Sequence, residues 1–252
     1  MTTTFRLDIL EMINRSKTGD VGLAFSYADL VEALYFGDSH GQSVLKYDAA
    51  KPQWEGRDYV VLSNPEAWPV FEVALKKAGF LDEILSSKKC LKIPGLEMAF
   101  KSPGQGLSVA YGVAQSLQIS KKKNRIYVLL DDEDLKNGQA WEAIMGIAYD
   151  RLSSVMAICS HSGTSKLEPL QDKFEAFGWK VFKLMNGHDQ NEILNTIAKA
   201  KQVERQPVLL LAPTVLGKGI PFMEGKQQYK GALFSEAEME EAVEILKAQN
   251  DA

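Results

Sequence analysis

The residues best suited to chemistry in this sequence are a run of four acids and a short polar segment further along the chain. Clustered carboxylates are typical ligands of hard cations such as Mg²⁺, and an imidazole can act as a base near neutral pH. The two segments are therefore the first candidates for a functional site. The acids are Asp131, Asp132, Glu133 and Asp134, and the polar segment is Ser160, His161 and Ser162.

A strand, a helix and a second strand must position these two segments. The apolar runs 126–130 and 155–159 each predict a strand that is buried on both faces. Apolar residues at helical spacing between them predict a helix over 138–152. A β-α-β unit places its ligands beyond the carboxyl ends of its strands. We therefore expect the acidic run and the Ser162 turn to face each other across one crevice.

Strands and helices alternate along the rest of the chain. This alternation predicts an α/β protein with a mostly parallel sheet and helices on both faces. The sequence has no internal repeat and no low-complexity linker, so we expect residues 1–252 to form a single domain. Ser26 is the predicted N-cap of the second helix. Helices are predicted at 5–16, 26–36, 69–79, 106–117, 167–177, 189–202 and from 235, and further strands at 59–62, 180–184 and 208–212.

Composition excludes several classes of protein. The 252 residues are 45% apolar, enough for a sizeable core, and the net charge of −4 argues against nucleic acid or an anionic membrane as a partner. No apolar run reaches the ~18 residues of a membrane span, and no signal peptide is evident. Cys90 and Cys159 lack the spacing of a metal site. We therefore expect a soluble, cytoplasmic protein.

The segment 129–143 resembles the thiamine diphosphate motif of transketolases. It reads Leu-Leu-Asp-Asp-Glu-Asp-Leu-Lys-Asn-Gly-Gln-Ala-Trp-Glu-Ala, where the family has Leu-Leu-Gly-Asp-Gly-Glu-Leu followed by Gly-Gln and Trp-Glu-Ala. The chain is similar to the N-terminal half of transketolase, as found in short two-subunit versions, and the resemblance implies the thiamine-diphosphate-binding fold. Further segments resemble the family in the same order, at 45–62, 94–97, 104–108, 177–179, 187–189 and 214–219.

The resemblance implies a site for thiamine diphosphate and Mg²⁺. It assigns cofactor-binding positions to Asp132, Ser162, Gly104 and Gln105, and the metal-binding positions to Asp132 and Ser162. The metal-binding asparagine of the family is therefore replaced by Ser162, which offers a neutral hydroxyl on a shorter side chain.

Two further replacements alter the diphosphate position. The family has glycine on either side of its aspartate, which lets backbone N–H groups approach phosphate oxygens closely. Here Asp131 and Glu133 stand at those positions and add both bulk and negative charge. At ~4 Å and an effective dielectric of ~20, each like-charge contact costs about 4 kcal/mol. We therefore expect that no cofactor binds.

The histidines that transketolases use to bind and deprotonate sugar hydroxyls are also replaced. Carboxylates at these positions would be weak bases unless burial raised their pKa. We therefore name no catalytic residue. Of the histidines present, His161 is the one near the predicted site, His188 is expected to be structural, and His40 is expected to be exposed. The replaced histidine positions are Asp20, Glu66, Pro213 and Lys230.

Several interpretations of function remain open. The leading one is a pseudoenzyme that serves as a scaffolding or regulatory subunit. The first alternative is a divergent active half of a two-subunit, thiamine-diphosphate-dependent ketol transferase. The second is an unrelated cation-dependent activity at residues 131–134. The simplest interpretation of these acids is a solvated helix start, favoured by the helix dipole.

The resemblance also implies partners. The helix that carries Trp141 and Glu142 lies at the dimer interface in the family, so a homodimer is expected. The cofactor-activating glutamate of the family lies on the other half of the enzyme. A separate subunit of the transketolase C-terminal type is therefore the second expected partner. This subunit could bind together with a second copy of this chain or in place of it.

Overall fold

The computed structural model describes residues 2–16, 20–39, 41–82, 93–99, 102–163, 166–232 and 234–250 of the chain. His40 and Cys90, discussed above, lie outside these described residues. The strands are β1 (Asp38–Ser39), β2 (Gln42–Ser43), β3 (Tyr59–Leu62), β4 (Met98–Ala99), β5 (Ile126–Asp131), β6 (Val155–His161), β7 (Lys180–Lys183) and β8 (Val208–Pro213).

One sheet organises the described part of the chain. Its six strands lie in the order β4-β3-β5-β6-β8-β7, and every neighbouring pair is parallel. β1 and β2 form a separate two-stranded antiparallel ribbon. The predicted α/β fold with a mostly parallel sheet is confirmed. β4 was not predicted, because a strand of two residues at a sheet edge carries no alternating or apolar pattern of its own.

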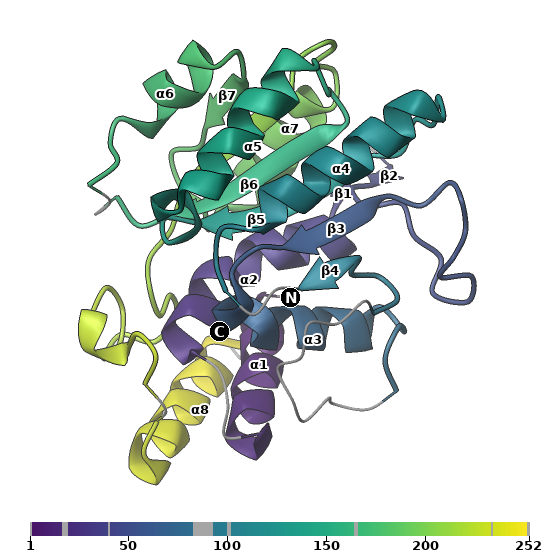
Figure 1. Ribbon diagram of the computed structural model, residues 1–252. Helices are drawn as coiled ribbons and strands as arrows, with labels where there is room; N and C mark the ends of the chain where they lie inside the picture. The colour runs from purple at the N-terminus through teal and green to yellow at the C-terminus, as the bar shows by residue number, and fades with distance from the viewer. Residues whose placement is uncertain are drawn as a thin grey trace.

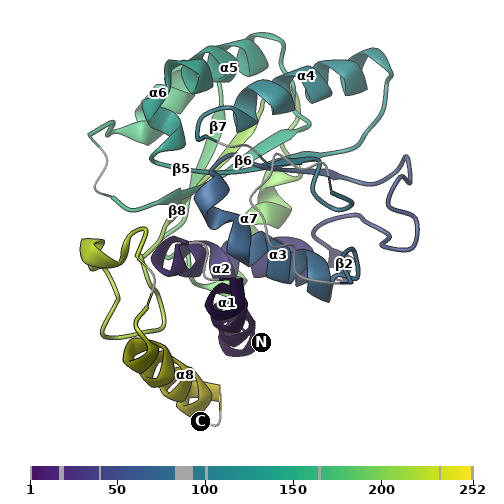
Figure 2. The ribbon, with the colours of Figure 1, turned by 60° about the horizontal axis from the view of Figure 1, so that its bottom comes forward.

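Helices cover both faces of this sheet (Figure 1). The helices α4, α5 and α6 pack on one face, and α1, α2, α3, α7 and α8 lie on the other (Figure 2). None of the described helices combines the length and hydropathy that crossing a membrane requires. Their bounds are α1 (Thr2–Ser16), α2 (Val21–Phe36), α3 (Trp68–Lys77), α4 (Gly106–Ile119), α5 (Gly138–Tyr149), α6 (Leu170–Ala176), α7 (Gln190–Ala200) and α8 (Glu236–Asn250).

Alternating side chains of the strands build the two cores. On β5, Tyr127 and Leu129 belong to the cluster on the α2 side, whereas Val128 and Leu130 belong to the cluster on the α4 and α5 side. This alternation follows from the two-residue period of a strand. Because both faces are covered, β5 reads in the sequence as a continuous apolar run.

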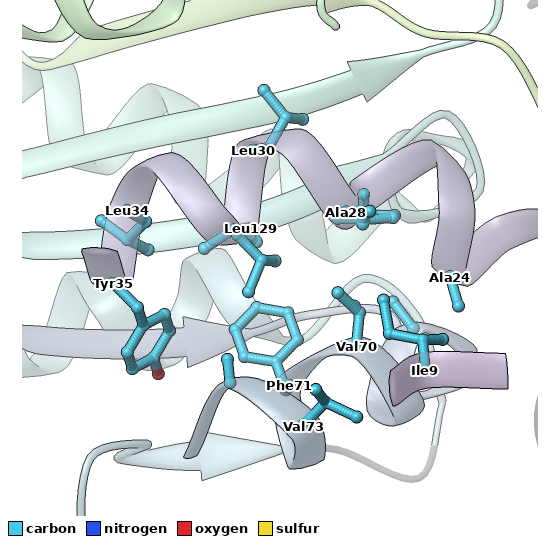
Figure 3. Close-up of a cluster of buried hydrophobic side chains, with 14 of the residues drawn as sticks. Ile9, Ala24, Ala28, Leu30, Leu34, Tyr35, Val70, Phe71, Val73 and Leu129 are labelled. Atoms are coloured by element: carbon cyan, nitrogen blue, oxygen red, sulfur yellow. The ribbon is translucent and has the colours of Figure 1, made fainter. Parts of the chain in front are cut away.

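Helix α2 is buried along its whole length between the sheet and a second helical layer. Figure 3 shows side chains of α2 gathered with Leu129 of β5, Ile9 of α1 and Phe71 of α3 in one buried cluster. A helix enclosed in this way is apolar on all sides rather than amphipathic. Its buried position brings the start of α2 to the carboxyl edge of the sheet, where the candidate site lies.

The predicted N-cap of α2 is wrong. The helix begins at Val21 with Asp20 as its N-cap, and the Asp20 carboxylate accepts the backbone N–H of Leu23 at 2.9 Å. Ser26 lies inside the helix and donates its hydroxyl to the Leu23 carbonyl at 2.7 Å. A serine hydroxyl can bond to backbone groups both at an N-cap and inside a helix, so Ser26 alone did not mark the helix start. The apolar residues that precede Ser26 were the better signal.

The register of the central strands aligns their carboxyl ends. Asp131 on β5 is paired with Ser160 on β6, and Ser160 is paired with Ala212 on β8. His161 is paired with Pro213 at the last step of the ladder. The acidic turn and the Ser162 turn therefore leave the sheet side by side.

Candidate functional site

A cavity of about 670 Å³ lies at the carboxyl edge of the sheet, beyond the ends of β5, β6 and β8. It has the size and position expected of a ligand site in an open α/β fold. The acidic turn and the Ser162 turn both line it, so the predicted crevice is confirmed. Its walls include Leu23 and Ser26 of α2, residues 131–133, Ser160, Ser162 and Thr214.

Asp132 and Ser162 meet directly in this cavity. The Ser162 hydroxyl donates to Asp132 Oδ2 at 2.6 Å, and the Ser162 backbone N–H donates to the same oxygen at 3.0 Å. The other oxygen, Oδ1, lies 2.7 Å from His161 Nδ1. Both oxygens of the predicted metal-binding carboxylate are therefore engaged within the chain.

His161 lies between two carboxylates. Its Nε2 is 2.5 Å from Glu168 Oε1, opposite the contact of Nδ1 with Asp132. The hydrogen bond to Asp132 raises the pKa of His161, and the charge of Glu168 adds to this. Burial alone would raise the pKa of Asp132, but hydrogen bonds from His161 and Ser162 lower it. The arrangement favours an imidazolium beside an ionised Asp132.

The Asp131 side chain turns inward and caps its own turn. Its Oδ1 accepts the backbone N–H of Glu133 at 2.9 Å and that of Asp134 at 3.3 Å, and its Oδ2 accepts Asn64 Nδ2 at 2.6 Å. Burial, with the charge of Asp134, raises the pKa of Asp131 to about 7. The backbone donors that a glycine here would leave for a ligand are thus occupied by a carboxylate of the chain.

Asp134 occupies a second set of donors. Its Oδ1 accepts the Ser63 hydroxyl and the backbone N–H of Gly104, each at 2.6 Å, and its Oδ2 accepts the Asp131 backbone N–H at 2.9 Å. Burial raises the pKa of Asp134 against these hydrogen bonds. Gly104 has φ +93, and a Cβ there would come within 2.6 Å of the Asn137 side chain, so this close approach requires glycine.

Gln105 stands at the N-cap position of α4 without capping it through its side chain. Neither Gln105 nor Gly104 belongs to the residues that line the cavity. Of the four positions that the resemblance assigns to the cofactor, Asp132 and Ser162 therefore come together in the cavity, and the other two do not line it.

Glu133 is neutralised by two lysines. Its Oε1 lies 2.8 Å from Lys136 Nζ and 2.9 Å from Lys230 Nζ. These ammonium groups lower the pKa of Glu133. Glu133 does add a negative charge beside the cavity, as expected from the sequence, and two lysines that were not expected there compensate it. Asp131 and Asp134, by contrast, have no lysine partner in the described part of the chain and accept backbone N–H groups instead.

The acids of this turn are neither solvated nor gathered around one point. Asp131, Asp132 and Asp134 are 5%, 9% and 1% exposed, which excludes the solvated helix start, and α5 itself begins only at Gly138. Each carboxylate points to its own partners. Among the described residues, no three His, Cys, Asp or Glu side chains are arranged to hold a metal ion. The geometry does not support a new cation site at 131–134.

Asp20 and Lys230, two of the histidine replacements, are close enough for their charges to interact, and Lys230 lines the cavity. Asp20 Oδ2 accepts the backbone N–H of Gly231 at 2.7 Å, and burial raises its pKa. Both ring nitrogens of His188 have partners within the fold: its Nδ1 contacts Asp29 Oδ2 at 2.6 Å, and its Nε2 accepts the backbone N–H of Val215 at 2.8 Å.

Several residues of the site were missed in the sequence. Asn64 directly follows β3, so its place at the carboxyl edge was a signal that could have found it. The same amide donates to Asp131 and accepts the backbone N–H of Glu66 at 3.0 Å. Glu168 and Lys136 had no such signal, because only the folded structure brings Glu168 to His161 and Lys136 to the cavity lining.

The chain is similar to known proteins along nearly its whole length. The family described as "Transketolase, thiamine diphosphate binding domain" matches residues 1–251. The 6-deoxy-6-sulfo-D-fructose transketolase subunit SqwG of Clostridium sp. (strain MSTE9) is 33% identical over 238 residues, which cover 86% of this chain and 84% of that protein. An apulose-4-phosphate transketolase subunit of Phocaeicola vulgatus is 29% identical over 258 residues, covering 94% and 89%.

Solved structures agree on the fold. Transketolase from Leishmania mexicana superposes with a TM-score of 0.81 at 19% identity, over 99% of this chain and 44% of that one. A transketolase variant from Pichia stipitis gives a TM-score of 0.82 at 19% identity, over 98% of this chain and 40% of that one. The chain thus spans less than half the length of these solved proteins.

Proposed function

Because the chain belongs to the transketolase family of thiamine-diphosphate-binding domains, we propose that it is an N-terminal-type transketolase subunit that has lost cofactor binding. In this proposal the chain serves as a scaffolding or regulatory subunit. The observation that carries the proposal is the hydrogen bonding of Asp131, whose carboxylate accepts the backbone N–H groups of Glu133 and Asp134. A ligand phosphate would have to displace this buried carboxylate to reach those donors.

The metal position supports the same conclusion. Mg²⁺ requires near-ideal octahedral geometry and oxygen ligands, usually including waters and substrate phosphates. Asp132 Oδ2 already accepts two hydrogen bonds from Ser162, and its Oδ1 contacts His161. A cation between Asp132 and Ser162 would break the contact that joins them. As arranged, these residues do not fit the metal-bound cofactor.

Isothermal titration calorimetry with thiamine diphosphate and Mg²⁺ tests the proposal. We expect no saturable heat, which corresponds to a dissociation constant of about 1 mM or weaker. The chain should be titrated alone and together with any copurifying protein, since a partner could complete the site. Saturable, Mg²⁺-dependent binding in the micromolar range would contradict the proposal.

One observation favours the second candidate, a divergent active half of a two-subunit ketol transferase. A cavity of about 670 Å³ persists at the carboxyl edge, and Asp132 and Ser162 both line it. Two relatives of comparable length are also named as transketolase subunits. This candidate requires carboligation of a ketose donor when the chain is mixed with a subunit of the transketolase C-terminal type.

The proposed partners are a second copy of this chain, a separate C-terminal-type subunit, or both. An exposed apolar stripe on α4 and α5 supports the homodimer. Tyr149 is 87% exposed, Ile119 is 82% exposed and Met145 is 45% exposed. Such large apolar side chains gathered on neighbouring helices mark an interaction surface. The indole N–H of the half-buried Trp141 on α5 donates to the Leu135 carbonyl at 2.7 Å, and its ring packs beside Phe174 and Phe177.

The proposal also covers the domain organisation of the chain, its location in the cell and the partners that it is not expected to bind. We treat residues 1–252 as a single domain, in line with the family match over 1–251. We place the protein in the cytoplasm, which agrees with the buried free thiol of Cys159. The net charge of −4 favours neither nucleic acid nor an anionic membrane as a partner.

A further inference from the structure

Three basic residues meet at the amino edge of the sheet, the edge opposite the candidate site. Lys201 follows α7, Arg125 directly precedes β5, and Lys46 lies in the loop between β2 and β3. Arg125, Lys46 and the carboxylate of Asp58, which precedes β3, are close enough for their charges to act on Lys201. We call these four residues the amino-edge cluster.

The carboxylate of this cluster does not pair with the basic side chains. Asp58 is buried, and its Oδ1 accepts the backbone N–H of Arg125 at 2.8 Å while its Oδ2 accepts that of Lys46 at 3.1 Å. In the described part of the chain, the side chains of Lys46, Arg125 and Lys201 form no ion pair with any carboxylate. The cluster therefore holds three cationic side chains that repel one another.

The amine of Lys201 is fixed against a buried backbone group. Its Nζ donates to the Val44 carbonyl at 2.6 Å, and the buried Tyr127 hydroxyl donates to the same oxygen at 3.2 Å. Burial lowers the pKa of Lys201, and the charges of Arg125 and Lys46 lower it further against the opposing charge of Asp58. A neutral amine is a nucleophile, whereas an ammonium is not.

Arg125 has hydrogen-bond donors to spare beside this amine. Its Nη2 donates to the backbone carbonyl of Lys201 at 2.5 Å, which is the one side-chain hydrogen bond of Arg125 within the described residues. A guanidinium carries five N–H donors, so most of them are unused. An anionic group added to Lys201 would therefore find a charge-assisted donor on the residue that already contacts its backbone.

We propose that Lys201 reacts reversibly with CO₂ to form a carbamate that Arg125 and Lys46 stabilise. The Nζ lone pair forms a bond to the carbon of CO₂, one C=O π bond becomes the carboxylate, and one N–H proton passes to water. No electron is gained or lost overall. The carbamate nitrogen keeps one N–H, which can still donate to the Val44 carbonyl. CO₂ is small and uncharged, so it suits a half-buried amine that larger acylating agents would reach less easily.

The same two cations favour both stages of this reaction. Their repulsion of the Lys201 ammonium favours the neutral amine, and their attraction stabilises the carbamate anion. Carbamate formation turns three cations and one carboxylate into two cations and two anions. The amino-edge cluster thus becomes neutral. The modification lies away from the cavity at the carboxyl edge, so it does not depend on whether a cofactor binds there.

Trapping in wild-type protein tests the inference directly. The protein is equilibrated with isotope-labelled bicarbonate at mildly alkaline pH, and the carbamate is followed by carbon NMR. It is then alkylated with triethyloxonium and located by peptide mass spectrometry. We expect an ethyl carbamate on Lys201 with about tenfold or higher occupancy than on Lys199, an exposed lysine two residues away that serves as an internal control. Lys201→Arg should lose the carbamate signal.

A second pair of variants tests the role of the two cations. Arg125→Gln with Lys46→Gln should lower the occupancy of Lys201 about fivefold or more at the same CO₂ concentration, because both partners of the carbamate are removed. The matched control Lys226→Gln with Lys247→Gln removes two exposed lysines outside the cluster and should behave like wild type. The inference is overturned if wild type carries no trapped carbamate on Lys201, or if the Arg125 and Lys46 variant matches the control.

Discussion

The carboxylates of Asp131 and Asp134 turn back onto backbone N–H groups beside the candidate site. Asp131 accepts the backbone N–H groups of Glu133 and Asp134, and Asp134 accepts those of Asp131 and Gly104, at distances between 2.6 and 3.3 Å. These are the kind of donors that an anionic ligand would use. The chain thus supplies its own anions, and the cost of burying two neighbouring acids appears as the raised pKa of both.

Restoring the family residues should reopen the site. The triple variant Asp131→Gly, Glu133→Gly, Ser162→Asn frees the backbone donors and returns a carboxamide to the metal position. We expect Mg²⁺-dependent binding of thiamine diphosphate at least about tenfold tighter than in wild type, measured by calorimetry. The control Glu55→Gly removes an exposed acid in a distant loop and should bind no better than wild type. Equal affinity of the triple variant and wild type would show that these residues do not close the site.

The sequence predicted which residues form the site better than it predicted where their side chains point. Asp132, Ser162 and His161 were expected at one crevice, and their side chains do meet there. The inward turn of Asp131 could not be predicted, because it depends on the Asn64 amide from the end of another strand. Glu133 and Lys230 are far apart in the chain, so no local sequence pattern predicts their ion pair.

Among the elements, the buried helix α2 is tied to its surroundings by an ionic cluster around Asp29. Arg6 Nη2 of α1 lies 2.6 Å from Asp29 Oδ2, and His188 Nδ1 lies 2.6 Å from the same oxygen. Arg6 also donates to the Lys218 carbonyl at 2.9 Å. One carboxylate thus joins α1, α2 and the loops after β7 and β8.

This cluster should make stability depend on pH in the acid range. Burial alone would raise the pKa of Asp29, but hydrogen bonds and charge from His188 and Arg6 lower it. A lowered folded-state pKa adds stability that is complete above the unfolded value of about 3.9 and is lost as pH falls through the folded value. Asp29→Asn should lower the free energy of unfolding by about 3–5 kcal/mol at pH 7, since it leaves Arg6 buried without its partner.

Urea unfolding from pH 7 to pH 3 measures this difference. The gap between wild type and Asp29→Asn should shrink below about pH 4, as wild type loses the contribution of the ionised carboxylate. Asp8→Asn, which removes an exposed carboxylate paired with Lys77 at 2.5 Å, is the matched control. A gap that stays constant down to pH 3 would contradict the role assigned to Asp29.

The order and type of the main helices and strands were predictable because their apolar residues form long runs or recur at regular spacing. The runs 126–130 and 155–159 became β5 and β6 with small changes at their ends. The start of α2 was placed too late because a helix buried on all sides lacks a polar face to mark its beginning. β4 depends on pairing with β3 rather than on its own sequence.

For the whole molecule, the stripe on α4 and α5 determines the expected assembly. Met145→Glu with Tyr149→Glu places two charges on this stripe and should convert a dimer to a monomer in light scattering after size-exclusion chromatography. Burying unpaired charges in an interface costs several kcal/mol, enough to shift the dissociation constant by about a hundredfold or more. The control Met185→Glu alters a methionine outside the stripe, after β7, that is also 87% exposed. It should leave the dimer unchanged. A double variant that remains dimeric would exclude this surface.

The first and last helices of the chain, α1 and α8, pack against each other, and the Thr4 hydroxyl donates to Asn250 Oδ1 at 3.2 Å. The beginning of one helix therefore lies beside the end of the other. Joining these ends through a short linker and cutting the exposed turn at Lys122 would give a circular permutant with the same contacts. In that permutant β5 and the acidic turn would be synthesised first, and the two halves of the α1–α8 contact would become neighbours in sequence.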